Sequence, residues 1–165
     1  MLDLSTTVNH DCKILELSWL SIESAVNHLW VQIRSTLSRD IEVTLAPVIR
    51  GGLAPAVILS HLMREEGFYN LVVPIMPDER GVTLLKDLPD PIIVVEDIVD
   101  TGETIRTLKS SDRPFEVCAV IGKKVPDIDF YQGLSYEAVI EKDDPKYWVV
   151  FPWEKSKEPD RKFGL

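Results

Sequence analysis

Short apolar runs rich in β-branched residues alternate along this chain with segments of helical periodicity. Apolar residues recur at three- and four-residue steps over residues 19–38, which predicts an amphipathic helix, and residues 53–66 predict a second helix that ends at Gly67. Further elements are expected as strands at 43–49, 71–76, 92–95 and 115–121, a helix at 102–109 and a candidate strand at 136–140. Strands separated by helices need crossover connections, so we predict an α/β fold: a single-domain, mostly parallel twisted sheet with helices on both faces.

The length and composition fit one soluble domain. The chain has 165 residues, of which 45% are hydrophobic and 27% charged, values typical of globular proteins. Its uncharged apolar runs fall well short of the ~20 residues that a membrane helix needs, and the first dozen residues, which include Asp3 and Asp11, lack the features of a secretory signal. We therefore expect a cytoplasmic protein with no membrane partner, in which Cys12 and Cys118 are buried thiols rather than a disulfide or metal ligands.

The charge balance argues against nucleic acid as a partner. With 18 Lys and Arg against 27 Asp and Glu, the chain has a formal net charge of −9, which repels a phosphate backbone unless basic residues gather on one face. The basic residues do not cluster in the sequence. A phosphate ligand would therefore have to be held locally, by backbone amides, a few cations and a metal ion.

A turn rich in Thr and Gly follows the most apolar run of the chain. This turn comprises Thr101, Gly102, Glu103 and Thr104 and opens the helix expected at 102–109. At such a helix start, unpaired backbone amides and the helix dipole favour a phosphate monoester, Gly102 permits close approach, and the threonines add hydroxyl donors. These four residues are candidate phosphate-binding residues.

Three acids precede this turn. Glu96 and Asp97 stand directly after the strand expected at 92–95, where paired carboxylates can accept hydrogen bonds from a vicinal diol and can hold a divalent cation. Asp100, between the diol and phosphate positions, is a candidate proton acceptor that faces the reacting atom.

The whole stretch 92–104 resembles the thirteen-residue signature of the type I phosphoribosyltransferases, which bind phosphoribosyl pyrophosphate. The segment Arg50-Gly51-Gly52, between an expected strand and an expected helix, suits an anion because a glycine pair lets backbone amides converge on it. It resembles the pyrophosphate-binding loop of the same family. The resemblance also implies Mg²⁺ as cofactor and a non-proline cis peptide bond between Ile49 and Arg50.

The C-terminal part of the chain resembles the hood, the base-binding portion, of the 6-oxopurine phosphoribosyltransferases. We expect this hood over residues 125–165. By position, Trp148 would stack on the purine, Val149 would offer backbone groups to its edge, and Glu154 would contact the purine amino group or a second metal ion. Trp153 is expected to be a packing residue.

A family lysine that donates to the exocyclic oxygen of the purine matches Lys123 or Lys124. The resemblance does not choose between the two; we favour Lys124, and Lys123 stays open as the alternative. One departure from the family concerns residues 77–91, which we expect to be an exposed connection. This segment lacks the Ser-Tyr pair with which relatives close a loop over the site, and Arg80, Thr83 or Lys86 could shield the reacting centre instead.

The resemblance implies a magnesium-dependent enzyme of purine salvage that transfers a 5-phosphoribosyl group from its pyrophosphate donor to guanine, xanthine or hypoxanthine. Asp100 would be the catalytic residue, and a homodimer or homotetramer is expected. Two alternatives remain: a non-catalytic regulator that senses phosphoribosyl pyrophosphate, and a phosphoribosyltransferase for another base.

Overall fold

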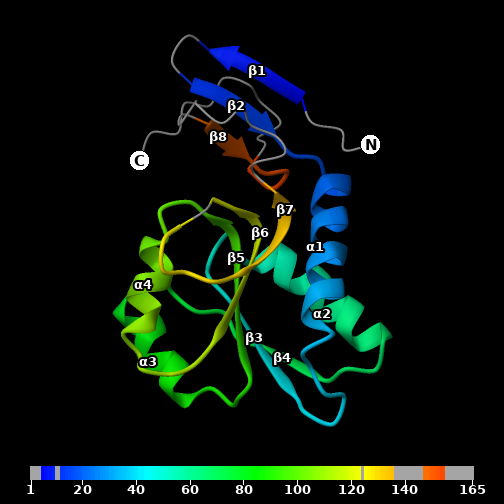
Figure 1. Cartoon of the computed structure of the whole chain (residues 1–165), viewed down its shortest axis with the longest axis vertical. Coiled ribbons are helices and arrows are strands. Elements are labelled where there is room, and N and C mark those ends of the chain that lie inside the picture. Colours follow the sequence, from blue (N-terminus) through cyan, green and yellow to red (C-terminus); the bar gives the residue numbers. More distant parts are fainter. Residues whose placement is uncertain (1–4, 10–11, 124, 136–146, 155–165) are drawn as a thin grey trace.

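The core of the protein is a five-stranded parallel sheet. The computed structural model describes residues 5–9, 12–123, 125–135 and 147–154. The strand order is β4-β3-β5-β6-β7, and every neighbouring pair is parallel. These strands are β3 (Val43–Pro47), β4 (Asn70–Val72), β5 (Ile92–Val99), β6 (Glu116–Gly122) and β7 (Tyr131–Ser135). The predicted α/β fold with a mostly parallel sheet is therefore confirmed (Figure 1).

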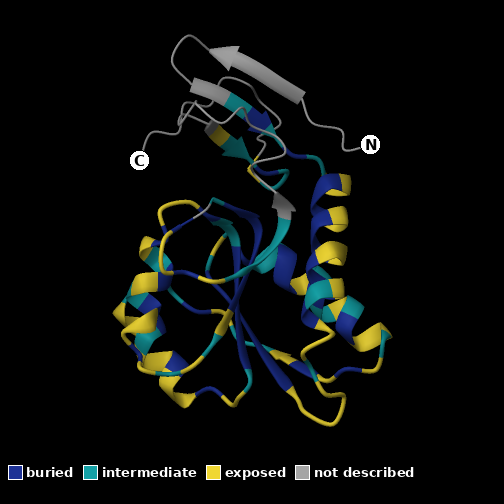
Figure 2. Ribbon diagram, in the orientation of Figure 1, coloured by how far each residue is buried: buried dark blue, intermediate teal, exposed yellow. Residues whose placement is uncertain are grey.

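Helices cover both faces of this sheet, as predicted. In Figure 1, α1 (Trp19–Ile33) and α2 (Leu53–Glu65) lie on one side, and α3 (Glu79–Asp87) and α4 (Glu103–Lys109) lie on the other. Side chains of β5 alternate between the two layers: Ile93 and Val95 join the cluster under α1 and α2, whereas Ile92 and Val94 join the second cluster. The three central strands β3, β5 and β6 are consequently buried along most of their length, while the outer helix faces are exposed (Figure 2).

Helix α1 is shorter than the expected 19–38. It starts at a Ser18 cap that accepts from the Ser21 backbone N–H at 3.1 Å. It ends at Ile33 because the next residues bond back to the last turn, with the Thr36 hydroxyl donating to the Ile33 carbonyl at 2.8 Å. Ser and Thr side chains that bond locally in this way compete with helical hydrogen bonding.

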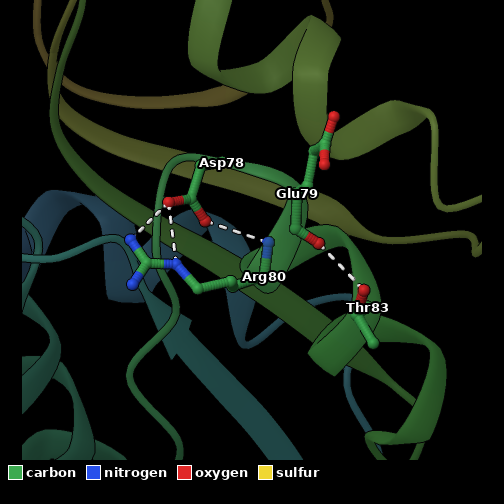
Figure 3. A network of polar contacts seen from close by, with 4 residues as sticks. All are labelled: Asp78, Glu79, Arg80 and Thr83. Carbon is green, nitrogen blue, oxygen red and sulfur yellow. Dashed lines mark hydrogen bonds and ion pairs between the residues drawn. The ribbon is translucent and has the colours of Figure 1, made fainter.

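Residues 77–91 are not simply an exposed connection, and this prediction was wrong. The segment contains α3, whose N-cap Asp78 accepts a hydrogen bond from the Arg80 backbone N–H at 2.9 Å (Figure 3). Leu85 on the inner side of α3 is fully buried and anchors the helix on the core. The prolines and acids that suggested a loop in fact flank and cap a helix.

A second, smaller sheet lies above the carboxyl ends of the main strands (Figure 1). It has the order β1-β2-β8, in which β1 (Ser5–Asn9) pairs antiparallel with β2 (Cys12–Glu16), and β8 (Tyr147–Val150) pairs parallel with β2. The expected hood over 125–165 therefore needs correction: β7 belongs to the main sheet, and the N-terminal hairpin joins β8. The candidate strand at 136–140 lies outside the described residues.

Within the described part of the chain, no helix is both long and apolar enough to cross a membrane. Cys118, on β6, is fully buried, as expected for a packing thiol, and burial raises its pKa to about 12.

Candidate functional site

The candidate site residues gather where the parallel strands of the main sheet end. Arg50 follows β3, Asp100 follows β5 and Lys123 follows β6. The carboxyl ends of parallel strands meet at one edge of a sheet, which is the usual ligand-binding edge of this class of fold. The order β3-β5-β6 makes these three strand ends immediate neighbours.

Glu96 and Asp97 lie inside β5 rather than after it, because this strand runs to Val99 instead of ending at residue 95. Glu96 is only 7% exposed, and burial, together with the neighbouring Asp97, raises its pKa to about 8. Burial also raises the pKa of Asp97, despite the Ile98 backbone N–H donating to its Oδ1 at 2.8 Å. Two poorly solvated carboxyl groups therefore occupy consecutive positions of the central strand, and they interact electrostatically.

Asp97 lies directly against the backbone of Gly51. A β-carbon on Gly51 would overlap the carboxylate of Asp97, and one on Gly52 would overlap the Val95 carbonyl and approach the backbone of Val48. A side chain at residue 51 would have to displace the Asp97 side chain and one at residue 52 would have to displace backbone, so the glycine pair lets this loop pack closely onto β5. The peptide bond between Ile49 and Arg50 is cis, as the family resemblance implied. The loop at residues 50–52 and the stretch 92–104 are thus in direct contact, although Arg50 and Glu96 are 46 positions apart in the sequence.

The Thr/Gly turn forms as expected, with a one-residue difference in the helix boundary. Gly102 has a positive φ of 78° and is the N-cap of α4, which begins at Glu103 rather than at 102. A side chain at Gly102 would collide with Val125 and Ile128, which back this turn. Thr101 is exposed, and its hydroxyl accepts from the Glu103 backbone N–H at 3.4 Å.

One contact at this turn was missed by the sequence analysis. The Arg106 Nη1 donates to the Thr101 carbonyl at 2.8 Å, and the Arg106 backbone N–H donates to the Gly102 carbonyl at 3.0 Å. The Arg106 side chain therefore holds the start of the turn, and its backbone N–H makes the first i→i−4 hydrogen bond of α4. Its position one turn into the expected helix was the available signal, but a basic residue there is ordinarily solvated.

Lys123 and Asp100 form an ion pair, with the Nζ of Lys123 against Oδ1 of Asp100. The Lys123 backbone N–H donates to the Val99 carbonyl at 2.8 Å, which continues the β5–β6 ladder and holds both side chains at the same edge. Lys124, the favoured of the two lysines in the sequence analysis, lies outside the described residues. The structure thus brings Lys123 to the candidate proton acceptor.

The hood residues divide into one exposed ring and one packed cluster. Trp148 on β8 is 64% exposed, whereas Val149 points to the opposite side of the strand and packs on the core. Trp153 stacks on Phe151 with ring centroids 4.8 Å apart and also contacts Trp19 at 5.8 Å, so it is a packing residue, as expected. Trp148 is therefore the hood tryptophan whose ring is available to a ligand.

The Glu154 side chain is hydrogen-bonded to the backbone of the turn that follows β8. Its Oε2 accepts from the Phe151 backbone N–H at 2.9 Å, and its charge contributes to the raised pKa of Asp97. Glu154 is thus close enough to Asp97 for electrostatic repulsion, which a cation between them would relieve.

The carboxylates of this site could supply only part of the coordination shell of a hard divalent cation. Carboxylate oxygens are ligands that Mg²⁺ prefers, and Mg²⁺ is commonly bound by one or two carboxylates plus phosphate oxygens and water. Glu96 and Asp97 offer such oxygens. In the described residues, however, no three His, Cys, Asp or Glu side chains come together as a metal cage. A bound Mg²⁺ would therefore depend on ligand oxygens as well as on the protein.

The sheet order, the helices on both faces and the small sheet above the strand ends define the type I phosphoribosyltransferase fold. No protein-family model and no curated protein sequence matches the chain. Among solved structures it is similar to a purine phosphoribosyltransferase from Pyrococcus horikoshii, with 21% identity and a TM-score of 0.56 over 90% of this chain and 99% of that one.

It is also similar to HGPRT-ase from Leishmania tarentolae, solved in complex with GMP, with 18% identity and a TM-score of 0.53 over 81% of this chain and 82% of that one. A third similar structure is hypoxanthine phosphoribosyltransferase from Trypanosoma cruzi, with 19% identity and a TM-score of 0.53 over 69% and 76% of the two chains. At these identities the likeness establishes the shared fold. The roles of individual residues depend on the geometry described above.

Proposed function

We propose that this protein transfers a 5-phosphoribosyl group from phosphoribosyl pyrophosphate to a 6-oxopurine base and releases pyrophosphate, a reaction of purine salvage. The observation that carries the proposal is the contact between Asp97 and Gly51. This contact brings Asp97, in the proposed diol- and metal-binding part of the 92–104 stretch, against the proposed pyrophosphate-binding loop at residues 50–52. One donor molecule that spans both segments would require them to be this close.

The donor would lie along the carboxyl edge of the sheet. Its 5-phosphate would bind the turn from Thr101 to Thr104 at the start of α4, where backbone amides are available. Its ribose diol would bind Glu96 and Asp97, and its pyrophosphate would bind Arg50 and the amides of Gly51 and Gly52. Mg²⁺, held by Glu96, Asp97 and pyrophosphate oxygens, with Glu154 nearby, would neutralise charge on the leaving group.

The chemical step breaks the bond between the anomeric carbon and the pyrophosphate oxygen, and the electron pair leaves with pyrophosphate. A ring nitrogen of the purine forms the new bond to that carbon and passes its proton to Asp100. Because charge develops on the sugar, most of the rate enhancement would come from orienting the two reactants and holding the leaving group.

The base would lie between the hood and the strand ends. Trp148 supplies an exposed ring for stacking, and Lys123 stands beside Asp100, where it can donate to an exocyclic oxygen. Such a donor favours a 6-oxopurine over a 6-aminopurine. The Val149 backbone would contact the purine edge.

Pyrophosphate release tests the proposal directly. The protein is incubated with donor and Mg²⁺, first without a base and then with one base at a time: guanine, xanthine, hypoxanthine, adenine or uracil. Release that requires one of the first three bases supports the proposal. Donor binding without release with any base would instead identify a sensor, and release with adenine or uracil would identify a different acceptor.

A further inference from the structure

The proposed phosphate-binding turn offers backbone amides to a ligand. The N–H groups of Gly102 and Thr104 donate to no acceptor within the described residues. Gly102 is buried, so its N–H meets little water, and a buried N–H without an acceptor costs free energy. An oxygen of a bound phosphate would supply that acceptor. Because a hydrogen bond weakens steeply as its angle departs from linear, the direction of these amides controls how tightly the phosphate binds.

The Arg106 side chain fixes one peptide group of this turn. Its Nη1 donates to the Thr101 carbonyl at 2.8 Å and lies 3.5 Å from the position of a β-carbon on Gly102. The peptide bond between Thr101 and Gly102 is trans, so its carbonyl and its N–H point in opposite directions. A guanidinium that holds the Thr101 carbonyl therefore directs the Gly102 N–H to the other side of the peptide group, away from Arg106.

The other neighbours of Gly102 cannot set this direction. Val125 and Ile128, from the connection between β6 and β7, would collide with a β-carbon on Gly102. Both side chains are apolar, so they limit how far the turn can shift but form no hydrogen bond to its backbone. The orientation of the peptide group between Thr101 and Gly102 therefore depends on the hydrogen bond from Arg106.

This hydrogen bond contributes to the orientation of the turn more than to the stability of the fold. Arg106 and Thr101 are both exposed, and substitutions at exposed residues usually change the free energy of unfolding little. Helix α4 is anchored separately, by the buried side chains of Ile105 and Leu108. Loss of the guanidinium should therefore leave α4 in place and free the Thr101 carbonyl to rotate.

Lys109 is the other basic residue of α4, and its contact lies elsewhere. Its Nζ donates to the Asp127 carbonyl at 3.2 Å, so it holds the connection between β6 and β7 rather than the turn. The two cations of this helix thus each hold a backbone carbonyl, but the carbonyl held by Arg106 belongs to the proposed phosphate-binding turn.

We propose that Arg106 is a positioning residue for the 5-phosphate of the donor: through the Thr101 carbonyl it directs the Gly102 N–H toward the phosphate, without contacting the phosphate itself. This inference rests on the proposed function and adds to it a residue outside the 92–104 stretch. Arg106 acts by preorganisation, because an amide that is already oriented does not have to be ordered when the ligand binds.

Calorimetry with two separate ligands tests this assignment. Ribose 5-phosphate probes the turn, and inorganic pyrophosphate with Mg²⁺ probes the other end of the proposed donor site. Arg106→Met should weaken ribose 5-phosphate binding roughly tenfold, the usual scale for one hydrogen bond to a charged group, and should leave pyrophosphate binding nearly unchanged. Arg106→Lys keeps the charge on a shorter side chain that lacks the planar guanidinium, so it should recover little of the lost affinity.

Lys109→Gln is the matched control, because Lys109 lies on the same helix, carries the same charge and also donates to a backbone carbonyl. It should leave both affinities unchanged. Thermal unfolding of each variant should give a melting temperature close to that of the wild type. A purely structural role of Arg106 would instead weaken both ligands together and lower the melting temperature, and that result would overturn the inference.

Two further outcomes would overturn the inference while the proposed function stands, provided that the wild-type protein binds both ligands. One is an Arg106→Met variant that binds ribose 5-phosphate as tightly as the wild type. The other is full recovery of affinity in Arg106→Lys, which would mean that the charge matters and the hydrogen bond to Thr101 does not. Wild-type protein that binds neither ligand would overturn both proposals.

Discussion

The carboxylate of Asp97 occupies the space that a β-carbon on Gly51 would need. The contact joins the central strand β5 to the loop after β3, which come from different parts of the sequence. Any side chain at residue 51 must therefore displace Asp97, whereas one at residue 52 must displace the backbone of Val95 or Val48. This difference separates an effect on the site from an effect on the fold.

Gly51→Ala is expected to reduce turnover by about 10²-fold, because a small misplacement of groups that hold a reactant is enough for such a loss. The chain should still fold, since Asp97 can rotate away. Gly52→Ala should instead lower the free energy of unfolding by about 1–3 kcal/mol, the usual cost of overpacking. Thermal unfolding and pyrophosphate release of both variants distinguish these outcomes, and equal destabilisation by the two would contradict the prediction.

Asp100→Asn should cut turnover by about 10²–10⁴-fold if Asp100 is the proton acceptor. Its side chain is 52% exposed, so the melting temperature should change little. Asp87→Asn, at the exposed end of α3, serves as the control and should retain full activity. Steady-state kinetics with unchanged turnover in Asp100→Asn would refute the catalytic assignment.

Lys123→Gln should lower activity toward 6-oxopurines and reduce the preference for them over adenine. The physical reason is the loss of a charged hydrogen-bond donor beside Asp100. Losing a hydrogen bond of this type should lower kcat/KM for a 6-oxopurine roughly tenfold or more. Kinetics with hypoxanthine and adenine measure both effects. A larger effect from Lys124→Gln would assign the base contact to that residue instead.

Trp148→Ala should raise the KM for the base roughly tenfold, with little change in donor affinity, because the ring is 64% exposed and free to stack. Trp148→Phe retains a stacking surface and should recover most of the affinity. The melting temperature should stay close to that of the wild type. If Trp148→Ala and the wild type have the same KM for every base tested, the ring is not the stacking residue.

The protein without ligands should lose stability as the pH rises from about 5 to 8. The pKa of Glu96 is raised from 4.5 to about 8 in the folded state, so over this interval the folded protein retains a proton that the unfolded chain has released. The free energy of unfolding must then fall with increasing pH, and the raised pKa of Asp97 acts in the same direction.

Urea unfolding at several pH values, without Mg²⁺, measures this slope. Glu96→Gln removes the titrating group and should flatten the profile while stabilising the protein at pH 8. A wild-type stability that increases with pH over this range, or a Glu96→Gln profile as steep as that of the wild type, would show that Glu96 is not responsible.

The order of the main elements was predictable because it depends on local patterns. The helix at α2 and the strand β6 were predicted to within one residue, since each is a continuous apolar or periodic segment. The signature at 92–104 is likewise one contiguous stretch, so the sequence alone located the acids and the Thr/Gly turn. Helix α3 was missed because its few buried residues, such as Leu85, stand among acids and prolines that usually mark a loop.

The sequence by itself determined the alternation of strands and helices and the identity of the groups at their ends. The tertiary structure alone decided which of these groups meet: Asp97 with Gly51, Lys123 with Asp100, and the N-terminal hairpin with β8. The physical reason is that helix and strand periodicity are encoded within a few residues, whereas these contacts depend on strand order and on the parallel register of the sheet. Both are set by packing between segments that lie far apart in the chain.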